Sequence, residues 1–446
     1  MAAQAEFGLV VCGGGPAGLG PFVAAARLGV LESLLDRGVL LVEPAAPGPG
    51  GFAHYGGLRA NSLGGAFLES LDALTGPEFA ELKRTRETLE LARWARSNPP
   101  LGVVAAYLAR LGEAVASVLR AHPACEVTAG ARVTQVDEVC GGVSVLIDGT
   151  DARRVFADRA ILAMGGRPLT AYREMSVVPG VSLSAYRSKL CHTADLLDSR
   201  YGLPWRLVGA IRQSGRVAVI GAAHSAWSAV GMLREDPRFL GGPAVRLSVL
   251  HRGPIRLYYT SAQEARDAGY RFDPVDDICP LSGRVHRFGG LRGEPKRLAA
   301  RSMGLVEGRP AAELVRVDAA DHDSRHAAKQ VLDEAGAIIV ATGYQARLPL
   351  LRHEDGTELV AAVSESGTVV NHAGHLVDVD GRPHPRLLAY GLGAGLGVSQ
   401  DIGGEPGYDR RADGVWLYQH DVGRLVLDEL LTAAVPEAAD AGVSAL

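Results

Sequence analysis

A glycine-rich turn near the N-terminus, Gly13-x-Gly15-x-x-Gly18, constrains the fold of this 446-residue chain more than any other feature. The turn follows Phe7–Cys12, an apolar run that predicts a buried parallel strand, and it precedes Leu19–Leu28, which predicts a helix. Gly13 permits the sharp turn, Gly15 lets a pyrophosphate approach the backbone, and Gly18 allows the helix to pack closely on the strand. The N-terminus of the helix would then face the phosphates.

An acidic residue completes this pattern. Glu43 ends the next predicted strand, Val39–Val42, and a carboxylate at that position can accept hydrogen bonds from both hydroxyls of an adenosine ribose. A glycine turn alone could be purely structural. Together, the strand, the helix and the terminal acid predict a dinucleotide site formed by Gly13, Gly15, Gly18 and Glu43.

A second, degenerate turn occurs in the other half of the chain. Gly221–Ala226 lies between a predicted strand, Arg216–Ile220, and a predicted helix, Trp227–Leu233, with alanine in place of two glycines. The strand that follows ends in an arginine, Arg252, and carries no acid there. An arginine at this place pairs with a 2′-phosphate, which favours NADPH, with Gly221 and Ser225 in the phosphate-binding turn. The alternative is an empty second unit that is kept as a scaffold.

Two strand–turn–helix–strand units in one chain indicate a duplicated architecture. We expect an α/β protein with two Rossmann-like, three-layer domains, the first of which is split by insertion of the second. The predicted domains are residues 1–166, then 167–343 as the insertion, then 344–446, which returns to the first domain. Glu126–Ile147 alternates in short pieces, which predicts antiparallel strands.

Charge and cysteine content narrow the class of protein. The formal net charge is −4, so a nucleic-acid partner is not expected. Five cysteines, an odd number without a C-x-x-C pair, indicate a reducing compartment and argue against a disulfide framework or a redox dithiol. No long apolar run or N-terminal signal is apparent, so we expect a cytoplasmic protein without a membrane partner. A homo-oligomer is possible.

The histidines suggest no metal centre. The two close pairs, His322 with His326 and His372 with His375, lie in polar segments without a convincing carboxylate partner. We therefore predict no bound metal.

The split arrangement of two dinucleotide units resembles the two-dinucleotide-binding-domain flavoproteins. Ala163–Gly166 and Ala341–Gly343 look like the paired crossings between domains in that family. The resemblance implies FAD in the first unit and NAD(P)H in the second, with Gly343 among the cofactor-binding residues.

Within that family, the chain resembles the class B flavin-dependent monooxygenases. Their fingerprint, F-x-G-x-x-x-H with a bulky aromatic residue further on, is matched here by Tyr186, Ser188, His192 and Leu196, with Ser188 in place of glycine and Leu196 in place of the aromatic. His224–Ala226 and Ala341–Tyr344 look like the N-hydroxylating amine monooxygenases.

The resemblance implies an FAD-dependent, NADPH-consuming monooxygenase that inserts one oxygen atom of O2 into a small molecule, by N-hydroxylation of an amine or amino acid. The alternatives are an NAD(P)H-flavin reductase or oxidase without oxygen insertion, and a non-catalytic flavin-fold binding protein.

Three polar residues are candidates for a catalytic role. By the resemblance, His192 would help to position NADPH at the domain crossing; the alternative is a hydrogen-bonded structural histidine. Asn61 and Ser62 lie in the glycine-rich loop after Glu43, where the family's chain passes the flavin ring. Their side chains could hydrogen-bond the flavin; the alternative is a turn or a helix N-cap, for which Ser62 is a favoured residue type.

Overall fold

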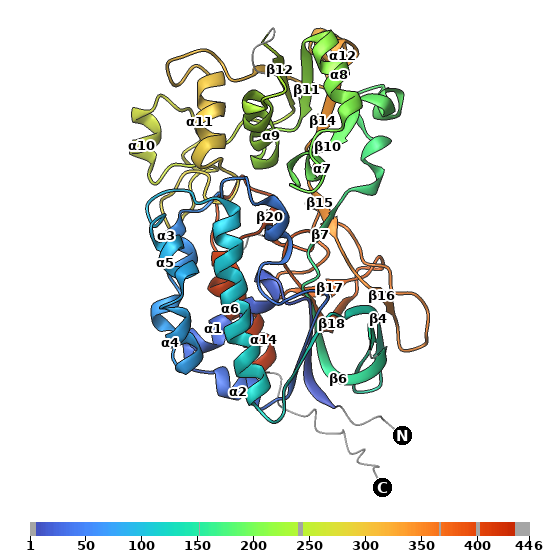
Figure 1. Cartoon of the computed structure of the whole chain (residues 1–446). Coiled ribbons are helices and arrows are strands. Elements are labelled where there is room, and N and C mark those ends of the chain that lie inside the picture. The colour runs from blue at the N-terminus through green and yellow to red at the C-terminus, as the bar shows by residue number, and fades with distance from the viewer. Residues whose placement is uncertain (1–5, 151, 240–243, 365–366, 398–401, 433–446) are drawn as a thin grey trace.

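The computed structural model describes residues 6–150, 152–239, 244–364, 367–397 and 402–432. Figure 1 shows two α/β lobes, one above the other, joined by extended segments. Residues 1–5 and 433–446, at the outer ends of the two predicted segments of the first domain, lie outside the described residues.

The larger sheet, in the lower lobe, combines a parallel and an antiparallel part. Its strands come from both ends of the chain, which is the split predicted for the first domain. They are β1 (Phe7–Cys12), β2 (Val39–Glu43), β3 (Glu126–Ala129), β4 (Arg132–Val139), β5 (Gly142–Asp148), β6 (Arg153–Leu162), β16 (Leu350–Arg352), β17 (His375–Val377) and β18 (Pro383–Ala389).

Strand β6 belongs to both parts of this sheet. Its first half pairs antiparallel with β5, and its second half pairs parallel with β1 and β18. The prediction of antiparallel strands over Glu126–Ile147 is therefore right for β4 and β5 but wrong for β3. Strand β3 pairs parallel with β2, with Glu43 opposite Ala129, because α6 returns the chain to the same end of the sheet.

The upper lobe contains a five-stranded parallel sheet in the order β10-β14-β11-β12-β13. Alternate residues of its central strands enter two different cores: Val217 and Val219 pack with Trp227, whereas Ala218 and Ile220 pack on the opposite face with Leu332. This period of two is what a strand covered by helices on both faces requires. The strands are β10 (Leu190–His192), β11 (Arg216–Ile220), β12 (Arg246–His251), β13 (Glu313–Arg316) and β14 (Ala337–Val340).

Helices cover both lobes. Those of the lower lobe are α1 (Pro16–Leu28), α2 (Leu31–Leu35), η1 (Gly50–Tyr55), α3 (Gly64–Leu68), η2 (Leu71–Ala73), α4 (Pro77–Leu82), α5 (Arg86–Ala92), α6 (Leu101–Ala121), α13 (Val415–Gln419) and α14 (Asp421–Thr432). Those of the upper lobe are η3 (Thr170–Arg173), η4 (Leu183–Lys189), α7 (Thr193–Leu197), α8 (Trp205–Ser214), α9 (His224–Glu235), α10 (Ala262–Asp267), α11 (Gly293–Ser302) and α12 (His322–Glu334).

Two short strands cross between the lobes. β7 (Gly166–Pro168) and β15 (Tyr344–Ala346) form an antiparallel pair with Tyr344 opposite Pro168. These crossings fall where the chain was expected to leave and re-enter the first domain; the boundaries at 166/167 and 343/344 themselves stay predictions. Two further small pairs join β8 (Ser176–Val178) with β9 (Val181–Ser182) and β19 (Leu396–Gly397) with β20 (Arg411–Ala412).

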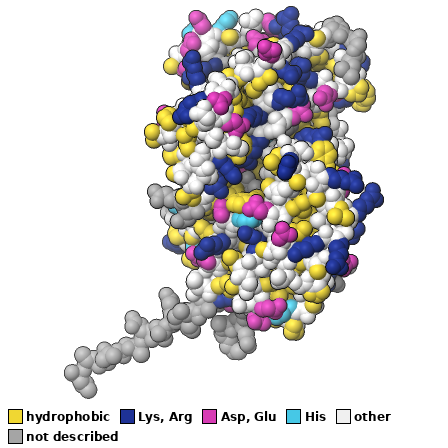
Figure 2. Space-filling view, turned by 90° about the vertical axis from the view of Figure 1, so that its left-hand side faces the viewer, with side chains coloured by type: hydrophobic (Ala, Val, Ile, Leu, Met, Phe, Trp, Pro, Cys, Tyr) yellow, Lys and Arg dark blue, Asp and Glu magenta, His cyan; other side chains and the backbone are white. Residues whose placement is uncertain are grey.

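Among the described residues, one helix, α6, is long and apolar enough to cross a membrane by length and composition alone. Half of its most apolar window is buried inside the molecule, as in the core helix of a globular domain. On the face shown in Figure 2, acidic and basic side chains are interspersed over both lobes. The described residues of that face therefore present no continuous basic surface of the kind that binds a phosphate backbone.

The hydrophobic cores of the two lobes are separate, so a core mutation in one lobe should destabilise that lobe alone. Trp227 is fully buried in the upper lobe, so Trp227→Ala should cost about 3–5 kcal/mol of local stability. Amide hydrogen exchange in β11 and α9 should become faster, by roughly a hundredfold to a few thousandfold, while exchange in β1 stays unchanged. Phe22→Ala, in the lower core, is the matched control and should give the reverse pattern. Equal acceleration in both lobes would contradict two independent cores.

Candidate nucleotide-binding and active site

The first glycine turn leaves no room for side chains at two of its positions. Gly13 has φ +107°, and a Cβ atom there would lie 2.5 Å from the carbonyl oxygen of Ala163. A Cβ atom on Gly18 would lie 1.8 Å from the carbonyl oxygen of Gly13. Gly13 also donates its N–H to Val42 at 2.8 Å, which ties the turn to the neighbouring strand. These contacts account for both glycines as tight-turn and close-packing positions.

Gly15, unlike Gly13 and Gly18, has open space beside its Cα atom. It precedes the first residue of α1, and a Cβ atom there would meet nothing closer than the Cα atom of Gly50, at 3.6 Å. No side chain caps this helix, so its first N–H groups lack side-chain acceptors. A bare backbone with open space in front of uncapped N–H groups fits the pyrophosphate of a dinucleotide.

Glu43 lies at the base of the same turn. Its Oε2 atom accepts a hydrogen bond from the Gly14 N–H at 2.6 Å, and Oε1 accepts one from Ala45 at 3.2 Å. Burial raises the pKa of this carboxyl, and the two backbone hydrogen bonds oppose that rise. Each carboxylate oxygen can accept a second hydrogen bond, so the two ribose hydroxyls of the predicted nucleotide fit the remaining capacity.

The second turn repeats the first in detail. Gly221 has φ +106°, and a Cβ atom there would lie 2.6 Å from the carbonyl oxygen of Ala341. Its N–H donates to Leu250 at 2.9 Å, as that of Gly13 does to Val42. Ala226 takes the place of Gly18 and is fully buried, so this turn accommodates one methyl group. Ser225 is half-buried in the first turn of α9, as expected for a residue near phosphates.

His224 joins the second turn to a distant segment, a contact that the sequence did not predict. Its Nε2 atom accepts a hydrogen bond from the backbone N–H of Arg292 at 3.0 Å. Burial, with a smaller contribution from the charge of Arg292, lowers the pKa of His224 to about 3. The imidazole is therefore neutral, and it holds the start of α11 against the N-terminus of α9.

Arg252 follows β12 directly, where the sequence predicted it. Its Nη2 atom donates to the carbonyl oxygens of Ser176 and Val177, each at 2.9 Å, so it also fastens strand β8. The side chain is exposed, and a guanidinium carries five N–H donors. Donors therefore remain for a phosphate.

His192 has the structural hydrogen bond considered for it, and its proposed role toward NADPH stays a prediction. Its Nδ1 atom accepts from the Ala194 N–H at 3.0 Å and so caps α7, while Nε2 has no hydrogen-bond partner among the described residues. The ring lies between Tyr172 and Tyr344, with centroids 5.2 and 6.2 Å away, next to the interlobe crossing. Burial lowers its pKa, so the neutral ring presents an unpaired Nε2–H.

The rest of the fingerprint lies elsewhere. Tyr186 donates its hydroxyl to Asp333 at 2.6 Å on the outer side of the sheet, and Ser188 is exposed. The structure therefore brings His192 to the crossing without Tyr186 or Ser188.

Asn61 and Ser62 lie in a loop at the junction of the two lobes. Asn98 holds this loop by donating to the carbonyl oxygens of Ala60 and Ser62 at 3.0 and 3.3 Å. A Cβ atom on Gly293, in the other lobe, would meet the Asn98 side chain at 2.8 Å. The prediction that Ser62 might cap a helix is wrong, because Leu63 occupies the N-cap position of α3. Neither the Asn61 nor the Ser62 side chain makes a hydrogen bond within the described residues.

Further contacts join the lobes around this loop. Ser199 donates both its N–H and its hydroxyl to the carbonyl oxygen of His54, at 2.9 and 3.0 Å. Burial, with the neighbouring Tyr55, raises the pKa of Tyr344. Gly343 has φ +91° and lies beside Arg411, which donates to the carbonyl oxygen of Tyr344 at 2.8 Å. No local sequence signal predicts these contacts, because the partners are distant in the chain.

The sequence was compared with protein-family models and with characterised proteins. No protein-family model matches the chain. The chain is 41% identical over 435 residues to a CMP-5′-(3-aminopropyl)phosphonate hydroxylase of Streptomyces rubellomurinus, covering 96% of this chain and 98% of the relative.

Two solved structures share the fold. A Kutzneria sp. 744 ornithine N-hydroxylase, in complex with reduced FAD, NADP+ and L-ornithine, superposes with a TM-score of 0.51 at 16% identity, covering 95% of this chain and 98% of that one. The FAD-bound cadaverine monooxygenase of Erwinia amylovora superposes with a TM-score of 0.57 at 13% identity over the whole of both chains.

Removing the charge of Glu43 should weaken the first nucleotide site selectively. Glu43→Gln keeps the size of the side chain but loses its charge-assisted hydrogen bonds, so FAD should bind more weakly by about 1.5–3 kcal/mol, or roughly ten- to a hundredfold. Titration of the apoprotein with FAD, followed by flavin fluorescence, measures this change. Glu32→Gln, exposed on α2, is the control and should bind FAD like the wild type. Unchanged affinity in Glu43→Gln would refute the assigned role.

Arg252 should determine the choice of nicotinamide nucleotide. In Arg252→Ala the KM for NADPH should rise tenfold or more while that for NADH stays nearly constant, because one charged hydrogen bond to a 2′-phosphate is lost. Arg246→Ala, at the opposite end of β12, should change neither value. If both nucleotides lose affinity equally, the contribution of Arg252 is confined to its bonds with strand β8.

Proposed function

The chain belongs to the N-hydroxylating class B flavin-dependent monooxygenases, and we propose that it hydroxylates the primary amine of a nucleotide-linked aminoalkylphosphonate. The reaction consumes NADPH, a proton and O2, converts R–NH2 to R–NHOH, and releases NADP+ and water. One oxygen atom of O2 enters the product and the other leaves as water.

The observation that carries this proposal is 41% sequence identity, over 96% of the chain, to a hydroxylase named for such a substrate. The glycine turns of both lobes, present in the same chain, agree with it. A reductase or oxidase without oxygen insertion, or a non-catalytic binding protein, is not favoured by these similarities.

The residues of the two turns fit the two cofactors. The open backbone at Gly15 and the N-terminus of α1 would bind the pyrophosphate of FAD, and Glu43 its ribose. Gly221, Ser225 and the N-terminus of α9 would bind NADPH, with Arg252 at the 2′-phosphate. When bound, FAD supplies the redox and oxygen chemistry, and the protein supplies placement.

The junction between the lobes has the properties that oxygenation requires. Tyr344, Tyr55 and the loop with Asn61 and Ser62 surround it, and the hydrogen bonds from Ser199 to His54 hold the lobes together there. We infer that the junction excludes water when both cofactors are bound there. The unpaired Nε2–H of His192 can orient the nicotinamide end of NADPH at this place, and Asn61 and Ser62 can hydrogen-bond the flavin edge.

A buried arginine supports an anionic substrate. The Arg292 guanidinium lies 4.1 Å from the ring centroid of Tyr258, donates to the carbonyl oxygen of Arg287, and leaves its buried Nε without a partner among the described residues. Burial lowers its pKa, and no described carboxylate makes an ion pair with it. Glu405, the nearby acid, is occupied by the N–H groups of Phe288 and Gly289.

The charge of Glu405 favours the protonated guanidinium, but no described carboxylate lies within ion-pair distance of Arg292. An anionic ligand in direct contact would offset more of the cost of burying this cation. The phosphonate or phosphate oxygens of the proposed substrate are suited to this position. Because Arg292 contacts His224 through its backbone, it lies beside the nicotinamide-nucleotide turn, where the substrate amine must also arrive.

The cellular setting also stays a prediction. All five cysteines lie within the described residues and are unpaired, which agrees with a reducing compartment such as the cytoplasm. We propose O2 as the oxidant, and a homo-oligomer remains a prediction.

Product analysis with a panel of amines tests the proposal. The FAD-loaded protein should convert CMP-5′-(3-aminopropyl)phosphonate to its hydroxylamine with one NADPH consumed per product. Ornithine and cadaverine, which lack the phosphonate, should be poor substrates. Preference for ornithine would contradict the substrate class, whereas NADPH consumption that yields only hydrogen peroxide with every amine would favour the oxidase alternative.

Arg292 provides the sharpest test of anionic recognition. Arg292→Gln should raise the KM for the phosphonate substrate tenfold or more, because a desolvated charged contact is lost, and should leave the dissociation constant of NADPH nearly unchanged. Arg297→Gln, on the exposed face of α11, is the control. If NADPH affinity falls and the substrate KM does not, the ligand of Arg292 is the nucleotide cofactor and the substrate assignment is wrong.

A further inference from the structure

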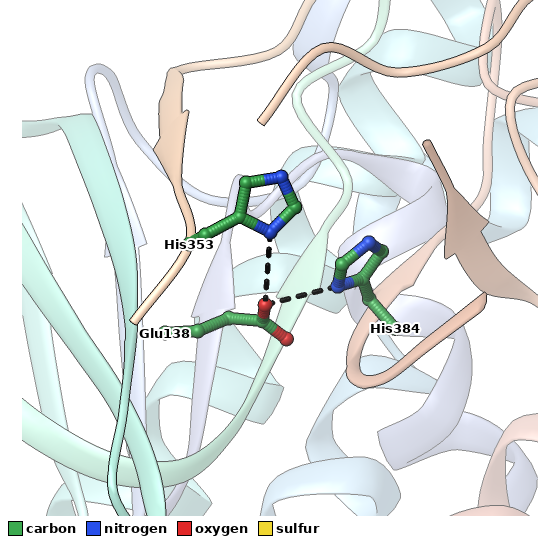
Figure 3. A group of neighbouring side chains, drawn as sticks. All are labelled: Glu138, His353 and His384. Atoms are coloured by element: carbon green, nitrogen blue, oxygen red, sulfur yellow. Dashed lines mark hydrogen bonds and ion pairs between the residues drawn. The ribbon is translucent and has the colours of Figure 1, made fainter. Parts of the chain in front are cut away.

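Three side chains from separate parts of the lower lobe converge at one point, away from both glycine turns (Figure 3). Glu138 belongs to β4, His353 follows β16, and His384 belongs to β18. Their nearest nitrogen and oxygen atoms all lie within 4.8 Å of one another. The Oε2 atom of Glu138 is 2.9 Å from Nδ1 of His384 and 3.9 Å from Nδ1 of His353.

A fourth residue, Asp378, contacts the His384 ring on the side away from Glu138. The Nε2 atom of His384 is 3.1 Å from Oδ2 of Asp378, while Oδ1 of Asp378 accepts hydrogen bonds from the N–H groups of Asp380 and Arg382 at 3.0 and 2.8 Å. The backbone hydrogen bonds show that Asp378 is an ionised acceptor, so it also accepts a hydrogen bond from the His384 ring. The proton of a neutral His384 therefore lies on Nε2, and Nδ1 presents a lone pair to Glu138.

This arrangement needs a positive charge between its members. A nitrogen lone pair and a carboxylate oxygen 2.9 Å apart repel each other unless a proton or a cation lies between them. A proton on each Nδ1 atom is one way to supply it; a single divalent cation bound by both nitrogens and the shared oxygen is another. Ligands about 2.0 Å from a tetrahedral ion are separated by about 3.3 Å, and the two observed separations lie on either side of that value.

We propose that Glu138, His353 and His384 bind a divalent transition-metal ion, with Asp378 as the residue that orients His384. Two imidazole nitrogens and one carboxylate oxygen form a donor set suited to Zn²⁺. A carboxylate behind a ligating histidine is the usual supporting contact in such sites. The His353 side chain is 24% exposed, which leaves a path from solvent and a position for water as the fourth ligand.

The site would be structural. It ties β4 to the segments that carry β16 and β18, and so fastens the C-terminal part of the chain to the antiparallel part of the larger sheet. The sequence alone predicted no metal, because its histidine pairs are close in the chain, whereas these three ligands are brought together only by folding. The exposed pair His322 and His326, with ring centroids 6.5 Å apart, is a possible place for adventitious binding and so supplies a control.

Metal content and thermal stability test the site without any activity measurement. The FAD-loaded protein is stripped with EDTA, exchanged into Zn²⁺, passed over a desalting column and analysed by atomic emission. The wild type should retain about one zinc per chain and melt at a higher temperature with Zn²⁺ than after EDTA, because the ion binds only the folded state. His384→Ala, Glu138→Gln and His353→Gln should lose both effects, and His326→Ala should keep them.

The flavin absorbance of each variant shows whether it has folded, and His353→Gln, the most exposed ligand, perturbs packing least. Wild type that retains no zinc after exchange into Zn²⁺ and desalting would overturn the proposal and leave His384 as an imidazolium between two carboxylates. Equal zinc in the wild type and in all three ligand variants, or loss of zinc in His326→Ala, would overturn it as well, by placing the ion on the surface.

Discussion

Gly13 and Gly221 lie where a strand turns into a helix while the carbonyl oxygen of a neighbouring strand passes too close for any side chain. Ala163 approaches the first glycine and Ala341 the second, and a Cβ atom would come within 2.5 and 2.6 Å of the two oxygens. The same two alanines donate N–H groups back to the strands that precede the glycines, at 2.9 Å each. Each turn is thereby fixed against the strand that leads to the interlobe crossing, so a nucleotide bound at either turn has a defined position relative to the other lobe.

The two copies of this turn differ in the residues that meet the nucleotide. Glu43 ends the second strand of the lower lobe, whereas Arg252 follows the corresponding strand of the upper lobe. A carboxylate suits ribose hydroxyls and repels a phosphate, and a guanidinium does the opposite. The upper turn has a further feature in His224, which is kept neutral by burial and accepts a hydrogen bond from Arg292. Under the proposed assignment, the same backbone frame would bind two different nucleotides and would connect the second to the proposed substrate arginine.

Local sequence patterns were sufficient to predict many of the strands and helices. The runs Phe7–Cys12 and Arg216–Ile220 are strands with the predicted bounds, because a short apolar run beside a glycine turn depends on its own residues. Long-range pairing could not be predicted in this way. Strand β3 joins β2 in parallel because α6 carries the chain back to the same end of the sheet. Ser62 is a residue type that commonly caps helices, but the N-cap position of α3 is occupied by Leu63. The cluster of Glu138, His353 and His384 has no sequence signature, because its members come from three separate strands or strand ends.

The central claim is that two nucleotide turns, facing one junction, let this chain transfer an oxygen atom from O2 to an amine. The most direct test is a reaction of the FAD-loaded protein with NADPH and CMP-5′-(3-aminopropyl)phosphonate under ¹⁸O₂, with the product analysed by mass spectrometry. The account predicts a hydroxylamine that contains one ¹⁸O atom derived from O2. An unlabelled product, or NADPH oxidation that yields labelled hydrogen peroxide and unchanged amine, would contradict it.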